Sequence, residues 1–369
     1  MAKYNQIVFT HLPHTMKGGL PIIDERNKKA LSSFSDKIYD CSYHPFGERK
    51  QNIFEAIFYK IRLLCGIELR SSKQQLFYSY IHNDKSLLFF SHSFYGVQIK
   101  NIKKCFPSCI VISFFHNVES EYCKQLLKTH FTLSLLYRYL LFRKIEKYTI
   151  RYSDRLIVLN QRDHLLLEKI YGCNKSYLFP TTILDRFQVC FKKKINIDKP
   201  LTLLFVGTLF PSNEQGVLWL AKNISPYIKS RINIVGLHMD NIAPQLIAFP
   251  NISVVGEVST EELDQYYYNA DVFISTLFIG GGMKTKIAEA MMFALPIIGT
   301  EEAFQGYDIN HSKIGLKSDN PSDIVSFINK LDSNRELLRL YSQNSRSIYL
   351  EKYSGESSYH YMEELLNID

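Results

Sequence analysis

The sequence of 369 residues contains no uninterrupted run of about 20 apolar residues, so no segment is expected to cross a bilayer as a helix. It lacks a basic and apolar leader at its start, which disfavours secretion. Its seven cysteines include no Cys-x-x-Cys pair, so they are expected to be free thiols in a reducing compartment rather than disulfides or zinc ligands. These absences together predict a cytoplasmic protein.

Positive charge is present in excess and is unevenly distributed. The net charge is +8, and the excess lies in residues 1–190, whereas residues 191–369 are net acidic. A basic half indicates an anionic partner such as a membrane surface or a lipid diphosphate, with a solvated face that binds nothing as the alternative. Lys144, Lys147 and Arg151 would share one helix face suited to anionic headgroups. Nucleic acid is not expected, because no base-stacking motif accompanies the charge.

Short apolar runs alternate with helical periods, which is typical of α/β domains with parallel sheets. A segment with prolines and a lysine run, residues 180–200, separates two such patterns. We therefore expect two Rossmann-like domains, residues 1–185 and 186–350. Residues 351–369 are expected to form a helix that packs back toward the first domain. Ligands of open α/β sheets bind beyond the carboxyl ends of strands, so an interdomain cleft is the expected site.

Two stretches of the first half are harder to assign. Residues 119–152 carry apolar residues at helical spacing and predict one long amphipathic stretch. Residues 36–85 have no steady period and are interpreted as a mixed, helix-rich insertion.

The strongest motif is Gly280–Gly282, which follows a predicted strand at 271–275 and opens a helix. Glycines let a ligand approach the backbone closely, and a helix start attracts phosphate through its free N–H groups. Lys284 and Lys286 lie in the first turn, where the helix dipole disfavours cations, and a bound anion would explain them. Glu289 is placed to hold the hydroxyls of a ribose.

These residues resemble a known family. GGGMKTKIAEAMMFALPIIGT resembles the donor-site segment of GT-B glycosyltransferases of the group 1, or family 4, type. FVGTLFPSNEQGVLWL, from residue 205, resembles the opening of their C-terminal domain. HNVESEY, DRLIVLNQRD and the Gly18-Gly19 pair resemble N-terminal segments. The resemblance covers nearly the whole chain, is strongest over 201–307 and implies the GT-B fold, with two Rossmann-like domains and an interdomain cleft. It implies that residues 1–185 bind the acceptor and that residues 186–350 bind the nucleotide sugar.

The resemblance also implies the site. His116 would lie near the transferred sugar, Lys286 would stabilise charge on the leaving nucleotide, and Gly18 and Gly19 would line an acceptor or phosphate loop. No Asp-x-Asp occurs, and neither a metal nor another cofactor is expected. The resemblance implies donor-binding roles for Gly207, Thr208, Gly280, Gly281, Gly282, Met283, Lys284, Thr285, Lys286 and Glu289.

The implied activity is transfer of a sugar, with retention, to a glycan or lipid-linked acceptor in synthesis of a cell-surface polysaccharide such as O-antigen or capsule. Peripheral attachment to the inner face of the cytoplasmic membrane would fit. One departure is that family members often carry a Glu where this chain has Gly281, so a carboxylate near the donor sugar is absent or comes from elsewhere. A nucleotide-sugar epimerase and a non-catalytic partner subunit remain alternatives.

Overall fold

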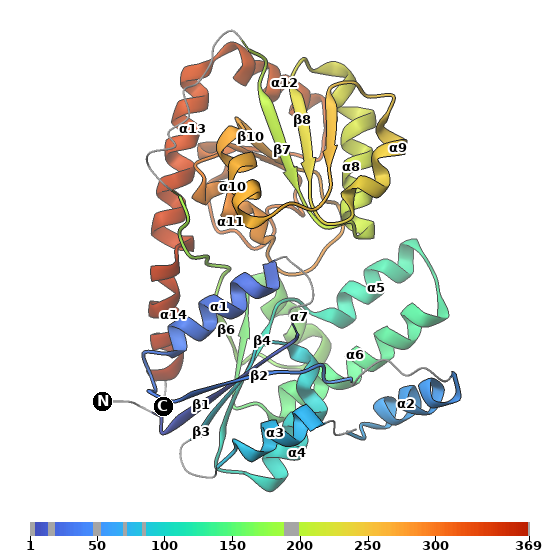
Figure 1. Cartoon of the computed structure of the whole chain (residues 1–369), viewed down its shortest axis with the longest axis vertical. Coiled ribbons are helices and arrows are strands. Elements are labelled where there is room, and N and C mark those ends of the chain that lie inside the picture. The colour runs from blue at the N-terminus through green and yellow to red at the C-terminus, as the bar shows by residue number, and fades with distance from the viewer. Residues whose placement is uncertain are drawn as a thin grey trace. The chain divides into compact units, whose positions relative to one another are not determined.

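The computed structural model describes residues 4–13, 19–46, 53–68, 72–82, 86–187 and 199–367. The chain divides into two compact units (Figure 1). The first contains most of the chain up to Pro180 together with the segment from Ser358, and the second contains Thr181–Ser357. The last helix, α14 (Gly355–Asn367), thus lies mainly in the first unit, where Arg155 donates a hydrogen bond to the carbonyl of Leu365 at 2.6 Å. The predicted cleft between domains stays a prediction.

The first unit is built on a parallel six-stranded sheet of order β2-β1-β3-β4-β5-β6. β1 and β3 are buried along their whole length, as expected for parallel strands that are covered on both faces. The strands are β1 (Gln6–His11), β2 (Ile38–Ser42), β3 (Ser86–Phe90), β4 (Ile110–Phe115), β5 (Arg155–Val158) and β6 (Ser176–Leu178).

The helices of this unit correct one sequence expectation. The stretch 119–152 is two helices, because Thr132 caps the second by accepting a hydrogen bond from the Leu135 amide. The described residues of the region 36–85, which is expected to be mixed and helix-rich, contain helices and the edge strand β2. The helices are α1 (Gly19–Leu31), α2 (Ile53–Cys65), α3 (Ser72–Ser79), α4 (Gly96–Cys105), α5 (Glu119–Thr129), α6 (Leu133–Tyr152) and α7 (Gln161–Tyr171), with a 3-10 turn at Ser93–Tyr95.

The second unit has a parallel sheet of order β12-β11-β10-β7-β8-β9. Its strands are β7 (Thr202–Val206), β8 (Arg231–Val235), β9 (Ile252–Val255), β10 (Val272–Ser275), β11 (Ile297–Gly299) and β12 (Gly315–Lys317). Its helices are α8 (Pro211–Asn223), α9 (Ala243–Leu246), α10 (Thr260–Asn269), α11 (Thr285–Met292), α12 (Pro321–Ser333) and α13 (Arg335–Ile348). α8 and α9 lie on one side of β7 and β8, and α10 and α11 lie on the other (Figure 1).

Each sheet has a point at which the strand order reverses. In the second unit it falls between β10 and β7, where the chain leaves one strand toward β11 and the other toward β8. In the first unit it falls between β1 and β3. Such switch points open a crevice beyond the carboxyl ends of the strands, where α/β sheets bind ligands. The predicted fold class, α/β with two parallel Rossmann-like sheets, is confirmed.

The cysteines of the described residues are unpaired thiols. Cys41, Cys109 and Cys123 are buried, whereas Cys65 at the end of α2 and Cys105 at the end of α4 are exposed. Burial raises the pKa of the Cys41 thiol to about 12 and that of Cys123 to about 11. Across the described ranges, no helix has the length and apolar character needed to span a membrane.

Candidate functional site

The glycine loop, residues 276–284, joins β10 to α11 at the switch point of the second sheet. Its start is fixed to α8, because Thr276 donates to the carbonyl of Gly216 at 2.9 Å. A Cβ at Gly216 would lie 2.2 Å from the Thr276 carbonyl oxygen, so only glycine allows this approach. Gly282 has a left-handed φ of 56°. The backbone of the loop is therefore set by glycine at specific positions.

Lys284 precedes the first residue of α11 and turns its amine back over the glycine loop. Its Nζ lies 2.6 Å from Oε1 of Glu302 and 3.3 Å from the carbonyl oxygens of Gly281 and Gly282. A Cβ at Gly280 would lie 2.8 Å from Lys284 Cε and 2.9 Å from Glu302 Oε1. The ion pair thus occupies the room that the missing side chain leaves at Gly280.

Lys286 and Glu289 form a second ion pair one turn further along. Nζ of Lys286 lies 2.7 and 2.8 Å from the two carboxylate oxygens of Glu289, which is completely buried. Tyr267 of α10 donates a third hydrogen bond to this carboxylate at 3.1 Å. Glu289, the residue predicted to bind the ribose, and Lys286, one of the two lysines predicted to meet the phosphates, are therefore bound to each other in this structure.

The remaining predicted donor residues are positioned by the backbone. Met283 is buried, and its sulfur accepts a hydrogen bond from the Thr181 amide at 3.4 Å, so it is a packing residue of the loop. Thr285 is the first residue of α11 and is half-buried. Tyr307 joins the turn after β11 to this helix start, since its hydroxyl donates to the Lys284 carbonyl and accepts from the Ala288 amide.

Gly207 and Thr208 follow β7, the strand next to β10, so their loop shares the same sheet edge. The carbonyl of Thr208 accepts a hydrogen bond from Asn213 of α8 at 2.6 Å. At the next strand, a Cβ at Gly236 would lie 2.0 Å from the Gly207 carbonyl oxygen. The loops that follow β7 and β10 thus start at the same edge of the sheet, on the two sides of the switch point.

In the first unit, His116 directly follows β4. Its Nε2 lies 2.8 Å from the carbonyl of Ser91, which follows β3, and its ring centroid is 5.2 Å from that of His92. Burial lowers the pKa of His116, chiefly because the charged imidazolium loses solvation. The imidazole is therefore neutral near pH 7 and can act as a hydrogen-bonding group. Of the predicted glycine pair, Gly19 is the first residue of α1, and Gly18 lies outside the described residues.

Several polar residues lie around the switch point of the first sheet and were not among the predicted site residues. Asp24 of α1 is buried, accepts a hydrogen bond from the Ser91 hydroxyl and lies 4.0 Å from His11. His11 ends β1, and its Nε2 lies 3.0 Å from Asp40. Burial alone would lower the pKa of His11, but the hydrogen bond to Asp40 and the nearby carboxylates raise it above its ordinary value. The signal in the sequence was a polar residue at the end of each strand, since His11 is the last residue of β1 and Ser91 directly follows β3.

Glu119 is not an exposed charge at the start of its helix, although carboxylates in the first turn of a helix are usually solvated there. It is buried at the start of α5 near Glu146 of α6. Burial, reinforced by the neighbouring carboxylate, raises the pKa of Glu119 to about 8. Burial also raises the pKa of Glu146 to about 7, although Ser120 and Tyr171 both donate hydrogen bonds to it.

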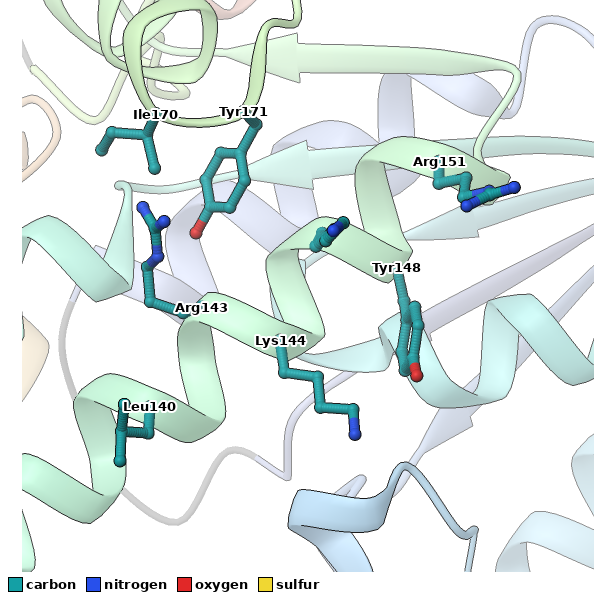
Figure 2. Close-up of a pocket in the computed structure, with 8 residues that line it drawn as sticks. Leu140, Arg143, Lys144, Tyr148, Arg151, Ile170 and Tyr171 are labelled. Atoms are coloured by element: carbon teal, nitrogen blue, oxygen red, sulfur yellow. The ribbon is translucent and has the colours of Figure 1, made fainter.

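A second concave feature of the first unit is a basic cavity of about 600 Å³ between α6 and α7. Figure 2 shows Arg143 pointing toward Tyr171, whereas Lys144 points to the other side of α6. No carboxylate of the described residues pairs with any of the four cations that line it. The lining residues are Leu140, Arg143, Lys144, Lys147, Tyr148, Arg151, Ile170 and Tyr171.

Comparison with known proteins supports the motif analysis. Residues 200–334 match the family model described as Glycosyl transferases group 1. A 44.6 kDa protein in the cps region of Klebsiella pneumoniae, itself uncharacterised, is 28% identical over 123 residues. That alignment covers 30% of this chain and 32% of the relative, so the chain matches about a third of the relative's length.

The fold is similar to those of solved structures over nearly the whole chain. Sucrose-phosphate synthase from Thermosynechococcus elongatus aligns with a TM-score of 0.73 over 98% of both chains, at 12% identity. Anabaena Alr3699/HepE, solved with UDP and glucose, aligns with a TM-score of 0.68 over 98% of this chain and 99% of that one, also at 12% identity. The predicted GT-B fold is thereby confirmed, and the resemblance of residues 200–334 to group 1 glycosyl transferases rests on the family model.

Proposed function

We propose that this protein transfers a sugar, with retention of configuration, from a nucleotide diphosphate donor to a glycan or lipid-linked acceptor of a cell-surface polysaccharide. The observation that carries the proposal is the junction of Gly280–Gly282 with the start of α11 at a switch point of the sheet. The glycine backbone without side chains, the helix dipole and two lysines together suit a diphosphate. The relative in a cps region supports a capsule or O-antigen pathway.

Each residue then has a role. The diphosphate approaches the glycine loop, and Lys284 and Lys286 supply positive charge that stabilises the leaving nucleotide as the glycosidic bond breaks. Glu289 binds the ribose, and His116 lies beside the transferred sugar. Binding by Glu289 requires a rearrangement of its bonds with Lys286 and Tyr267. The reaction is proposed to need no metal, because the lysines replace one as the counter-charge.

The test is a thermal-shift screen with UDP-, GDP-, dTDP- and CMP-sugars, followed by donor hydrolysis with and without EDTA. UDP-sugars are the first choice, because the HepE structure holds UDP. We expect one donor to stabilise the protein and to be hydrolysed, and nuclear magnetic resonance of the product to show the donor's anomeric configuration. Interconversion of donor sugars without any acceptor would favour an epimerase, and binding without turnover would favour a non-catalytic subunit.

We further propose that the first unit docks on an anionic membrane through the basic cavity. α2 lies against α6, since Tyr137 donates to the Lys60 carbonyl at 3.2 Å. α2 also exposes apolar side chains, with Ile57, Phe58 and Ile61 all more than half exposed. Cations beside exposed apolar residues are typical of surfaces that bind anionic lipid, at about 1 kcal/mol per charge.

Flotation with phosphatidylcholine and phosphatidylglycerol vesicles tests this docking. The wild type should float only with phosphatidylglycerol, and Lys147→Glu with Arg151→Glu should abolish flotation. A double variant of the second unit, Lys222→Glu with Lys229→Glu, makes the same charge change and should float as the wild type does. Equal binding to both vesicles would contradict the proposal.

A further inference from the structure

The proposed donor site contains two carboxylates of its own. Lys284 is paired with Glu302 and Lys286 with Glu289, so the two cations face two carboxylates. A diphosphate that enters this site meets lysines already neutralised. It must therefore either replace one of the carboxylates or bind where the positive electrostatic potential of the lysines is weak.

The two carboxylates differ in their freedom to leave. Glu289 is on a helix, has no exposed surface and receives hydrogen bonds from Lys286 and Tyr267. Glu302 is in the turn after β11, and 18% of its side chain is exposed. Removing Glu289 from its partner would leave a buried charge, whereas Glu302 can rotate into solvent. Of the two lysines, Lys284 is therefore the one that can change its partner.

The position of the Lys284–Glu302 ion pair requires that a ligand bound at the glycine loop displace Glu302 from Lys284. Lys284 and Glu302 lie against Gly280, within 3 Å of where a Cβ would be. This is the space in which the glycine loop allows a ligand close to its backbone. A ligand on this backbone and the intact pair compete for the same volume.

We propose that Glu302 is an internal counter-ion that occupies Lys284 until the donor diphosphate displaces it. Glu302 is then a specificity-determining residue, because only a ligand with enough negative charge replaces a carboxylate on Lys284. Lys286 stays beside the buried Glu289, whose hydrogen bonds rearrange only as ribose binding requires, and adds its charge from that position. This inference rests on the proposed function, because it takes the same site as the donor site.

The test compares Glu302→Gln with Glu301→Gln by isothermal titration. Glu301 is the neighbouring residue, but it is 63% exposed and pairs with Lys317, so it is a matched control. The probes are UDP, inorganic pyrophosphate and uridine. We expect Glu302→Gln to bind UDP and pyrophosphate about fivefold or more tightly than the wild type, with uridine binding unchanged. Glu301→Gln should bind all three as the wild type does.

A double variant keeps the result interpretable. In a Lys284→Met background, Glu302→Gln should no longer change UDP binding, because the exchange acts through Lys284. Unchanged or weaker UDP binding by folded Glu302→Gln, or an equal gain in the Lys284→Met background, would overturn the inference and leave the proposed function standing. If the wild type binds neither nucleotides nor nucleotide sugars, the proposed function falls, and the inference falls with it.

Discussion

Nζ of Lys286 lies between 2.7 and 2.8 Å from both carboxylate oxygens of Glu289, a residue with no exposed surface. Lys286→Ala would leave this carboxylate buried without its ion-pair partner, and such changes cost about 3–5 kcal/mol. Urea denaturation of Lys286→Ala should show that the free energy of unfolding falls by this amount. Combining Lys286→Ala with Glu289→Gln should recover part of it, and the exposed Lys313→Ala should change little. Equal stability of Lys286→Ala and the wild type would contradict the pair.

Glu289 also has a predicted role toward the donor. Glu289→Gln keeps the size of the side chain and removes its charge, so it separates packing from binding. Because the charged carboxylate is the stronger acceptor for ribose hydroxyls, we expect nucleotide affinity to fall about tenfold. Calorimetry with UDP measures this, and unchanged affinity in the folded variant would remove the ribose role.

Gly216 tests the contact between α8 and the glycine loop. An added Cβ would lie 2.2 Å from the Thr276 carbonyl oxygen, so Gly216→Ala must displace the loop. We expect a loss of at least about 2 kcal/mol, together with weaker donor binding. Gly172→Ala is the control, because a Cβ there meets no atom within 4 Å and only its positive φ costs about 1 kcal/mol. Similar losses of stability in both variants would show that the glycine loop can move away from α8 at little cost.

The buried carboxyls of Glu119 and Glu146 predict a dependence of stability on pH. Their pKa values in the folded chain, about 8 and about 7, lie above the ordinary value of 4.5. The folded state therefore binds more protons than the unfolded state between these limits. The stability that they contribute is complete below pH 4.5 and is lost as the pH rises to about 8.

Denaturation at a series of pH values measures this loss. Glu146→Gln should flatten the curve between pH 5 and about 7, whereas Glu121→Gln, whose carboxylate pairs with Lys124 at 3.5 Å, should leave the curve unchanged. A curve for Glu146→Gln that is parallel to that of the wild type would show that Glu146 is ionised in the folded chain.

His116 is expected to act as a neutral group, because burial lowers its pKa. Its Nε2 is held at the Ser91 carbonyl, so replacement by Ala removes an oriented ring. Turnover should fall about 100-fold or more, and the wild-type rate should show no loss from this group as the pH rises above 7. His164 of α7, which contacts Ser176 of the edge strand β6, is the control for loss of a histidine. A wild-type turnover in His116→Ala would remove the catalytic role.

The sequence identifies most of the second unit, because strands such as β7 and β10 are apolar runs that end at glycines or at a motif. The sequence does not predict β2 and β6, because these short edge strands lack a periodic pattern of buried apolar residues. It also misses the break near Thr132, since a helix cap is local chemistry within a continuing apolar pattern.

The candidate site was predictable only where its residues are close in sequence. Lys286 and Glu289 are three positions apart and could be placed on one helix face. Glu302 is 18 residues from Lys284, and only the turn after β11 brings them together. The same holds for Asp24 and Ser91, which come from α1 and the end of β3.

The contrast between buried and exposed cysteines gives the protein a natural site for reporter dyes. A thiol whose pKa is raised by burial forms little thiolate and reacts slowly with maleimides, as Cys41 and Cys123 should. Cys65 ends the same helix that carries Ile57, Phe58 and Ile61, and it is open to solvent. A polarity-sensitive fluorophore on Cys65, with Cys105 replaced by Ser, would read out in its emission colour whether α2 enters lipid.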